Sequence, residues 1–150
     1  MKLLKELNMN LTLEIITPEK VVYKNEIDEL VAPTVNGQIA ILPNHVGLFA
    51  KIIPGELIIR KANSQQVVAV TGGFLEVAKN HVSILADYAI RAEDIEVAKA
   101  QEAQKRAEKL MAEKTSDRDF RMAQADLIRA ITELRVATKY KRKSPRPTEV

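Results

Sequence analysis

The spacing of apolar residues changes once along the chain, near residue 90, and this change constrains the fold more than any other feature. Before it, apolar and polar residues alternate over short stretches, as at Leu11, Leu13 and Ile15, a pattern typical of half-buried strands. Turn signals separate these stretches, the clearest being Asn36-Gly37, because both residue types tolerate positive φ. About 8–10 short strands with no helical pattern between them predict an all-β antiparallel sandwich or barrel over residues 10–90.

After residue 90 the apolar spacing is helical. Two runs recur at intervals of three or four residues: Ala100, Ala103, Ala107 and Leu110, then Phe120, Ala123, Leu127, Ala130, Leu134 and Ala137. Asp94 and Glu96 are expected to open the first helix, since carboxylates are favoured at the positive end of the helix dipole. Ser116 and Asp119 resemble a capping box at the start of the second helix. The short link predicts an antiparallel helical hairpin over residues 91–140, and therefore a two-domain α+β protein.

The seam of this hairpin is built mainly from alanine. Alanine allows close approach of two helices but buries little apolar area, at about 25 cal/mol per Å². The predominance of Ala, Glu, Lys, Gln and Arg nevertheless gives both helices high intrinsic helical propensity. The pattern therefore fits a hairpin that opens at modest cost, and it fits a permanently packed hairpin equally well.

The net charge of +3 is unevenly distributed. Residues 1–90 carry 8 basic and 9 acidic groups, and the basic excess of the second half lies in the tail from Lys139 to Val150. Such a tail is commonly a solvated terminus, but it also leaves open a nucleic-acid-binding β-barrel module. Against that alternative, aromatic residues make up only 4% of the chain, and no interleaving of basic and aromatic residues is visible.

No catalytic or metal-binding constellation is visible in the sequence. The chain has no cysteine and only two histidines, His45 and His81, and it contains no Walker loop, nucleophile elbow or HExxH motif. No stretch of about 18 apolar residues is present, so no membrane-spanning helix is expected. These features predict a cytoplasmic protein without catalytic residues of its own.

Three segments, in order, resemble the epsilon subunits of F-type ATP synthases. They are Asn36-Gly37-Gln38-Ile39-Ala40-Ile41-Leu42-Pro43-Asn44-His45, then Val70-Thr71-Gly72-Gly73-Phe74-Leu75-Glu76-Val77 followed by Val82-Ser83-Ile84-Leu85-Ala86-Asp87, and Arg91-Ala92-Glu93-Asp94-Ile95. Leu134-Arg135-Val136 is similar to part of the last helix of that family. The resemblance extends from about Asn10 to Ala137.

The resemblance implies a non-catalytic subunit of the central stalk, held peripherally on the cytoplasmic face of an energy-transducing membrane through its complex only. The sandwich is expected to bind the gamma subunit and the rotor ring of c subunits. Asn36, Gly37 and Gln38 match the family segment that touches the ring, and Pro43, Asn44 and His45 match positions near gamma. Residues 1–9 are expected to be a disordered extension, and residues 141–150 form a basic, proline-containing tail to which no role is assigned.

The hairpin is the regulatory element of this family. Its extended form is expected to enter the catalytic head of alpha and beta subunits and to inhibit ATP hydrolysis. Arg129, Arg135 and Lys139 are the candidates for contacts with acidic segments of the head. The same three residues also suit the solvent-facing side of an amphipathic helix.

Some bacterial members of the family bind ATP on the folded hairpin through an Ile/Leu-Asp-x-x-Arg-Ala motif. Here the corresponding residues are Ile95, Glu96 and Lys99, so both polar positions differ. Lysine is a point charge that cannot reproduce the forked donors of arginine. Arg106 and Arg129 match other basic positions of that site, but Glu133 replaces a further arginine. We therefore expect weak or absent ATP binding and no other cofactor.

Overall fold

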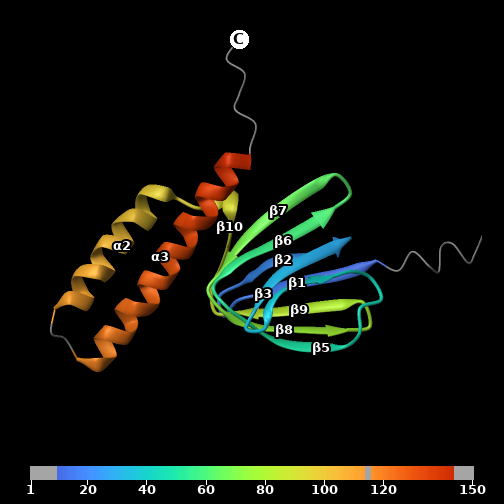
Figure 1. Ribbon diagram of the computed structural model, residues 1–150, viewed down its shortest axis with the longest axis horizontal. Helices are drawn as coiled ribbons and strands as arrows, with labels where there is room; N and C mark the ends of the chain where they lie inside the picture. The colour runs from blue at the N-terminus through green and yellow to red at the C-terminus, as the bar shows by residue number, and fades with distance from the viewer. Residues whose placement is uncertain (1–9, 114–115, 144–150) are drawn as a thin grey trace, which may run out of the picture.

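Ten strands, one 3₁₀ turn and two long helices make up residues 10–113 and 116–143, the part of the chain that the computed structural model describes (Figure 1). The strands are β1 (Leu11–Ile16), β2 (Val21–Ile27), β3 (Glu29–Thr34), β4 (Gly37–Ile41), β5 (Leu48–Ile52), β6 (Gly55–Lys61), β7 (Ser64–Val70), β8 (Gly73–Ala78), β9 (His81–Ala86) and β10 (Ala89–Arg91). The 3₁₀ turn η1 (Ala92–Asp94) leads to helices α2 (Val97–Ala112) and α3 (Asp117–Lys143). The expected order of a strand domain followed by a helical hairpin is confirmed.

The strands form one continuous curled sheet. Their order is β10-β7-β6-β3-β5-β8-β9-β1-β2, and β4 pairs with β3 off this path. The sheet turns a corner where β3 meets β5 through a single partnered pair, Thr34 and Ile52. It curls until β2 lies close to β6 and β10, so that the strands enclose one core as a flattened barrel or sandwich.

One pairing departs from the antiparallel expectation. β1 runs parallel to β9, with Leu13 opposite Val82 and Ile15 opposite Ile84, whereas the other pairings are antiparallel. Local alternation predicts that a stretch is a strand, but it contains no information about which distant strand becomes its neighbour.

Alternating residues fill the interior of the sheet. Leu11, Leu13, Leu57, Leu75 and Ile84 are fully buried within one cluster, as expected for strands with one face inward.

Gly73 is required where β8 begins beside β9. Its φ is +135°, and a Cβ atom there would lie 2.1 Å from the Leu85 carbonyl oxygen. The glycine at position 73 therefore permits a close approach of two strands.

Arg91 fixes the connection between the two domains. Its guanidinium donates a hydrogen bond to the Val22 carbonyl oxygen at 3.2 Å and lies 5.9 Å from the centroid of the Tyr23 ring. Burial raises the pKa of Tyr23, and the Arg91 charge partly offsets this. The last strand is thus anchored to β2 immediately before the chain turns into η1.

The start of the first helix differs from the expectation. Asp94 ends η1, Ile95 is extended, and Glu96 is the N-cap of α2, which begins at Val97. Asp94 therefore belongs to a short tight turn that redirects the chain, while Glu96 lies at the start of the helix, as expected. At the second helix, the Asp119 amide donates to the Ser116 hydroxyl at 3.3 Å, which confirms half of the predicted capping box.

Candidate functional site

The β3–β4 turn presents three of the predicted contact residues at one exposed tip. Asn36 occupies the turn, and Gly37 and Gln38 begin β4; all three are exposed. The Thr34 hydroxyl donates to the Gly37 carbonyl oxygen at 2.6 Å and accepts from the Asn36 amide at 3.3 Å. Gly37 has a φ of +109°, and a Cβ atom added there would meet no other atom within 4 Å. The tip is therefore rigid at its base and open to solvent.

Pro43, Asn44 and His45 lie together in the loop between β4 and β5. The Asn44 amide donates to the Asn80 side-chain oxygen at 2.5 Å, which ties this loop to the β8–β9 turn. The His45 amide donates to the Leu42 carbonyl oxygen at 3.2 Å, and its ring Nδ1 lies 2.8 Å from the Val46 carbonyl oxygen. His45 is half-buried, and its two hydrogen bonds stabilise the loop.

An exposed apolar row crosses the outer face of four neighbouring strands. Phe74 is paired with Leu85, Leu85 with Ile16, and Ile16 with Val21, from β8 to β2. Phe49 of β5 stacks on Phe74 with ring centroids 5.5 Å apart. Phe49 is 68% exposed and Leu85 58% exposed, so this row is a surface feature of the kind found at interaction sites.

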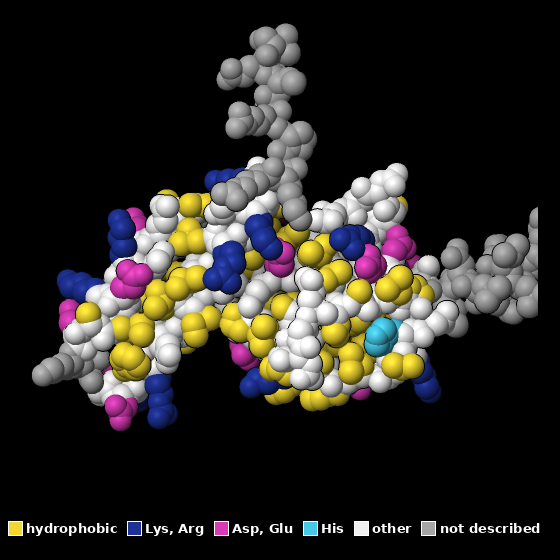
Figure 2. Space-filling view, in the orientation of Figure 1, with side chains coloured by type: hydrophobic (Ala, Val, Ile, Leu, Met, Phe, Trp, Pro, Cys, Tyr) yellow, Lys and Arg dark blue, Asp and Glu magenta, His cyan; other side chains and the backbone are white. Residues whose placement is uncertain are grey.

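Hydrophobic side chains gather on the side of the sandwich where β5 and β8 lie (Figure 2). The sequence did not reveal the apolar row because each member stands singly in its strand. The signal was present in the alternation: Phe74 and Leu85 sit at positions facing away from buried Leu75 and Ile84.

The alanine seam joins α2 to α3 as predicted. Five of its members have 4% or less of their surface exposed: Ala100, Ala107, Ala123, Ala130 and Ala137. The two large residues near the far end of the hairpin, Leu110 and Phe120, are 41% and 40% exposed. The two helices are thus in close contact at the alanines, whereas the larger side chains, which could bury most apolar area, stay partly exposed.

A second, small apolar cluster docks α3 onto the sandwich. Val136 of α3, Ala69 of β7 and Ala92 of η1 are buried together, apart from the main core. Farther along α3, the Lys139 ammonium lies 2.8 Å from a Glu56 carboxylate oxygen. Figure 1 shows only the C-terminal half of α3 beside the strands, while the far end of the hairpin projects away from them.

A polar cluster also joins α3 to the sandwich. The Tyr88 hydroxyl, in the turn before β10, donates to Glu133 Oε1 at 2.5 Å. The same oxygen lies 3.5 Å from Arg129 Nε, and the Arg129 guanidinium carbon lies 3.6 Å from the Tyr88 ring centroid. Burial, then the hydrogen bond to Glu133 and its negative charge, raise the pKa of Tyr88 to about 12. Burial lowers the pKa of Arg129, but Tyr88 and Glu133 together raise it by more.

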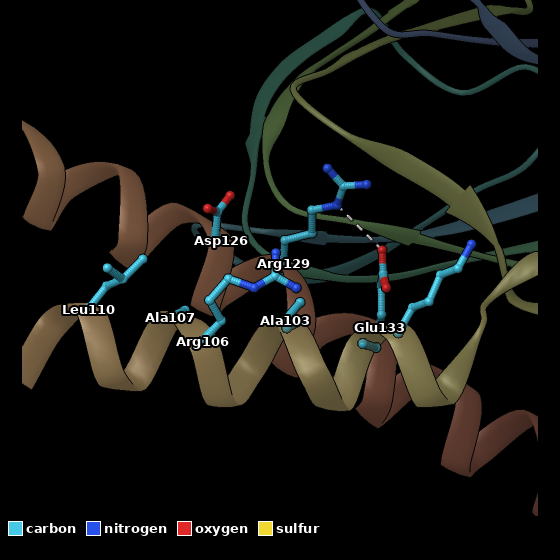
Figure 3. A pocket seen from close by; sticks show the side chains of 10 residues that line it. Ala103, Arg106, Ala107, Leu110, Asp126, Arg129 and Glu133 are labelled. Atoms are coloured by element: carbon cyan, nitrogen blue, oxygen red, sulfur yellow. Dashed lines mark hydrogen bonds and ion pairs between the residues drawn. The ribbon is translucent and has the colours of Figure 1, made fainter.

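The groove between the two helices has a cavity volume of about 250 Å³. Lys99, Arg106 and Arg129 line it, together with Asp126 and Glu133. Arg106 extends from α2 across the groove, whereas Arg129 turns toward the sandwich and reaches Glu133 (Figure 3).

Two of the five residues expected at a nucleotide site lie outside this groove lining. Ile95 packs in the docking cluster around Val136, and Glu96 forms an ion pair with Lys99 at 2.8 Å. The hydrogen bond to Glu96, and then its charge, raise the pKa of Lys99.

The candidate contacts with a catalytic head are dispersed along α3. Arg129 is held by Tyr88 and Glu133, and Lys139 by Glu56. Arg135 is exposed and lines a shallow cavity of about 200 Å³ that Gln38 also lines. The hairpin position thus brings Arg135 and Lys139, but not Arg129, close to Gln38 of the β3–β4 tip.

Within residues 10–113 and 116–143, no group of three His, Asp or Glu side chains is arranged to hold a metal ion. Among the helices so described, neither is long and apolar enough to cross a bilayer.

Two solved structures with a similar arrangement are chains of mitochondrial ATP synthases. One chain of the Euglena gracilis complex of OSCP, F1 and c-ring superposes with a TM-score of 0.67 at 18% identity, covering 87% of this chain and 81% of that one. A chain of the Tetrahymena thermophila central stalk and c-ring gives a TM-score of 0.55 at 20% identity, covering 88% and 96%. These similarities support the fold.

Sequence comparisons are more specific. The ATP synthase epsilon chain of Herpetosiphon aurantiacus is 42% identical over 129 residues, which cover 86% of this chain and 95% of that protein. That of Dehalococcoides mccartyi (strain CBDB1) is 43% identical over 136 residues, covering 90% and 96%. The family pattern for the ATP synthase delta/epsilon chain matches in both parts, the beta-sandwich domain over residues 10–92 and the long alpha-helix domain over 93–138. With both domains matched in order and relatives covered nearly end to end, the chain belongs to the delta/epsilon chain family of ATP synthases.

Proposed function

We propose that this chain is a non-catalytic, peripheral subunit of the central stalk of an ATP synthase, which couples the rotor to the catalytic head and restrains ATP hydrolysis. The observation that carries the proposal is the contrast between its two parts. The sandwich is built around one large apolar core, whereas the hairpin is attached to it through a small separate cluster. A stable sandwich with a weakly docked hairpin suits a subunit that binds the rotor through one domain and moves the other.

The proposed gamma-binding surface combines the Pro43–His45 loop with the exposed apolar row. The loop leads into β5, where Phe49 stacks on Phe74, so the two features are continuous. Burying aromatic and aliphatic side chains that are now about half exposed would supply the apolar centre of a stable interface. The Asn36–Gln38 tip, on a different strand pair, remains available for polar loops of the rotor ring.

Gamma binding is tested by co-purification with single-residue variants. Leu85→Lys places a charge within the apolar row and is expected to weaken association at least tenfold. Asn63→Lys places the same charge at the exposed β6–β7 turn and serves as the matched control. Equal retention of gamma by both variants would remove the apolar row from the proposal.

The hairpin is proposed to inhibit hydrolysis when it leaves the sandwich and extends toward the alpha and beta subunits. On release, Arg129 would lose its contact with Tyr88 and Lys139 would lose Glu56, and carboxylates of the head would take the place of these partners. Deleting residues 93–150 from the subunit in the assembled complex tests this role. We expect faster ATP hydrolysis with ion coupling retained; unchanged hydrolysis would mean that the hairpin is only structural.

A further inference from the structure

The contact between Tyr88, Arg129 and Glu133 differs from an ordinary surface ion pair. The Glu133 side chain is only 12% exposed, and burying a carboxylate is costly unless hydrogen-bond donors replace the lost water. One of its oxygens accepts the Tyr88 hydroxyl at 2.5 Å and lies 3.5 Å from Arg129. An exposed ion pair of this kind on a helix contributes little to stability. The shorter contact of Glu133 is the one with the Tyr88 hydroxyl.

The three residues are divided between the two domains. Arg129 and Glu133 are one turn apart on α3, so their ion pair is retained if the hairpin leaves the sandwich. Both contacts of Tyr88, the hydrogen bond and the stacking on Arg129, exist only when the hairpin is docked. The free energy of the cluster therefore depends on hairpin position chiefly through Tyr88.

We infer that Tyr88 is a positioning residue that holds α3 against the sandwich, with Glu133 and Arg129 prearranged on the helix to receive it. The Glu133 carboxylate of the chain itself completes the cluster, so docking requires no bound anion. Arg129 stays protonated throughout, so its positive charge remains beside the Glu133 oxygen that accepts the Tyr88 hydroxyl. This role of Tyr88 holds whether or not the hairpin inhibits hydrolysis.

The test uses the rate at which a buried thiol is labelled. The chain has no cysteine, so Ala69→Cys places a single thiol beneath α3 in the docking cluster, and its labelling requires hairpin release. Ala32→Cys, in the fully buried core of the sandwich, reports unfolding of the sandwich instead. Rates measure rare opening events, so a mostly closed hairpin does not hide the effect.

Each reporter is combined with changes that preserve shape. Tyr88→Phe keeps the ring and removes the hydroxyl, and Glu133→Gln removes the charge of the acceptor. Asp126→Asn is the matched control, because Asp126 lies on α3, lines the same groove and forms no ion pair within the part of the chain that the structure describes.

We expect Tyr88→Phe and Glu133→Gln each to raise the labelling rate of the Ala69→Cys thiol about tenfold, the effect of losing a hydrogen bond to a charged group. The double variant should label little faster than either single variant, because both remove the same interaction. Asp126→Asn should leave the rate unchanged, and the Ala32→Cys thiol should be unaffected throughout. Unchanged labelling in Tyr88→Phe, additive effects in the double variant, or an equal rise at both reporters would each overturn the inference.

Discussion

Replacing Val136 by alanine should detach the hairpin without weakening the sandwich. Val136 is 2% exposed and lies in the docking cluster, not in the main core. The change removes two buried methyl groups, each worth about 0.8 kcal/mol, and leaves a small cavity that adds to the loss. Docking should therefore weaken by about 1.5–2.5 kcal/mol, which raises the open-to-closed ratio about ten- to sixtyfold.

Hairpin release is measured by energy transfer between dyes on two exposed residues, Asn63→Cys on the sandwich and Lys105→Cys on α2. In a urea titration, the midpoint of hairpin release should fall in Val136→Ala, while the midpoint of sandwich unfolding, followed by circular dichroism of the strands, should stay unchanged. The matched control, Ile84→Val in the main core, should do the reverse and lower sandwich stability by about 1 kcal/mol. If both midpoints move together in Val136→Ala, the two clusters form one cooperative unit and the reasoning fails.

Three further outcomes follow from the same geometry. Gly73→Ala should destabilise the sandwich by about 4 kcal/mol or more, because the added Cβ would lie 2.1 Å from a carbonyl oxygen. Gly37→Ala, which has open space around it, should cost about 1–2 kcal/mol of stability. Urea unfolding compares the two variants, and equal losses of stability would contradict the steric argument. Docking raises the pKa of Tyr88 from 10.0 to about 12. The contribution of the Tyr88 hydroxyl to docking should therefore be complete below pH 10 and lost as the pH rises through about 12. Dye-pair measurements of hairpin release in Tyr88→Phe should lack this dependence on pH. Calorimetry of the purified subunit with ATP should detect no micromolar binding, because Glu133 adds negative charge to the groove and pairs with Arg129. A micromolar dissociation constant for ATP would refute this prediction.

Local features of the sequence predicted the elements of the fold well. The alternation of Leu11, Leu13 and Ile15 identified a strand with one buried face, and the alanine spacing identified the hairpin seam. Each of these elements depends on the spacing of apolar residues within a short segment, which can be read from the local sequence.

Relations between distant segments could not be predicted in this way. Val136 lies off the alanine seam, and its burial is explained only by the position of β7 and η1. Tyr88 and Glu133 are 45 residues apart, so nothing in the local sequence indicates that they form a hydrogen bond. Asp94 was assigned to the helix because a carboxylate suits the 3₁₀ turn η1 as well as the first turn of an α-helix, whereas Glu96 does lie at the start of α2.

The candidate site residues illustrate the same limit. The residues of each short loop, Asn36–Gln38 and Pro43–His45, lie together because they are consecutive. The residues spread over the hairpin were brought together only in part, and Ile95 belongs to the docking cluster instead of the groove. Their roles toward gamma, the rotor ring and the catalytic head stay predictions that the variants above address.

The parallel pairing of β1 with β9 has a consequence for how the protein is made. β1 precedes the other described strands along the chain and lies between β2 and β9, and β9 is translated after seven of them. The nascent chain can form the β1–β2 hairpin early, but one edge of β1 must wait until nearly the whole sandwich has been synthesised. An unpaired edge on a growing polypeptide is a site for wrong associations, so slow translation before residue 81 should favour aggregation more than slow translation after it.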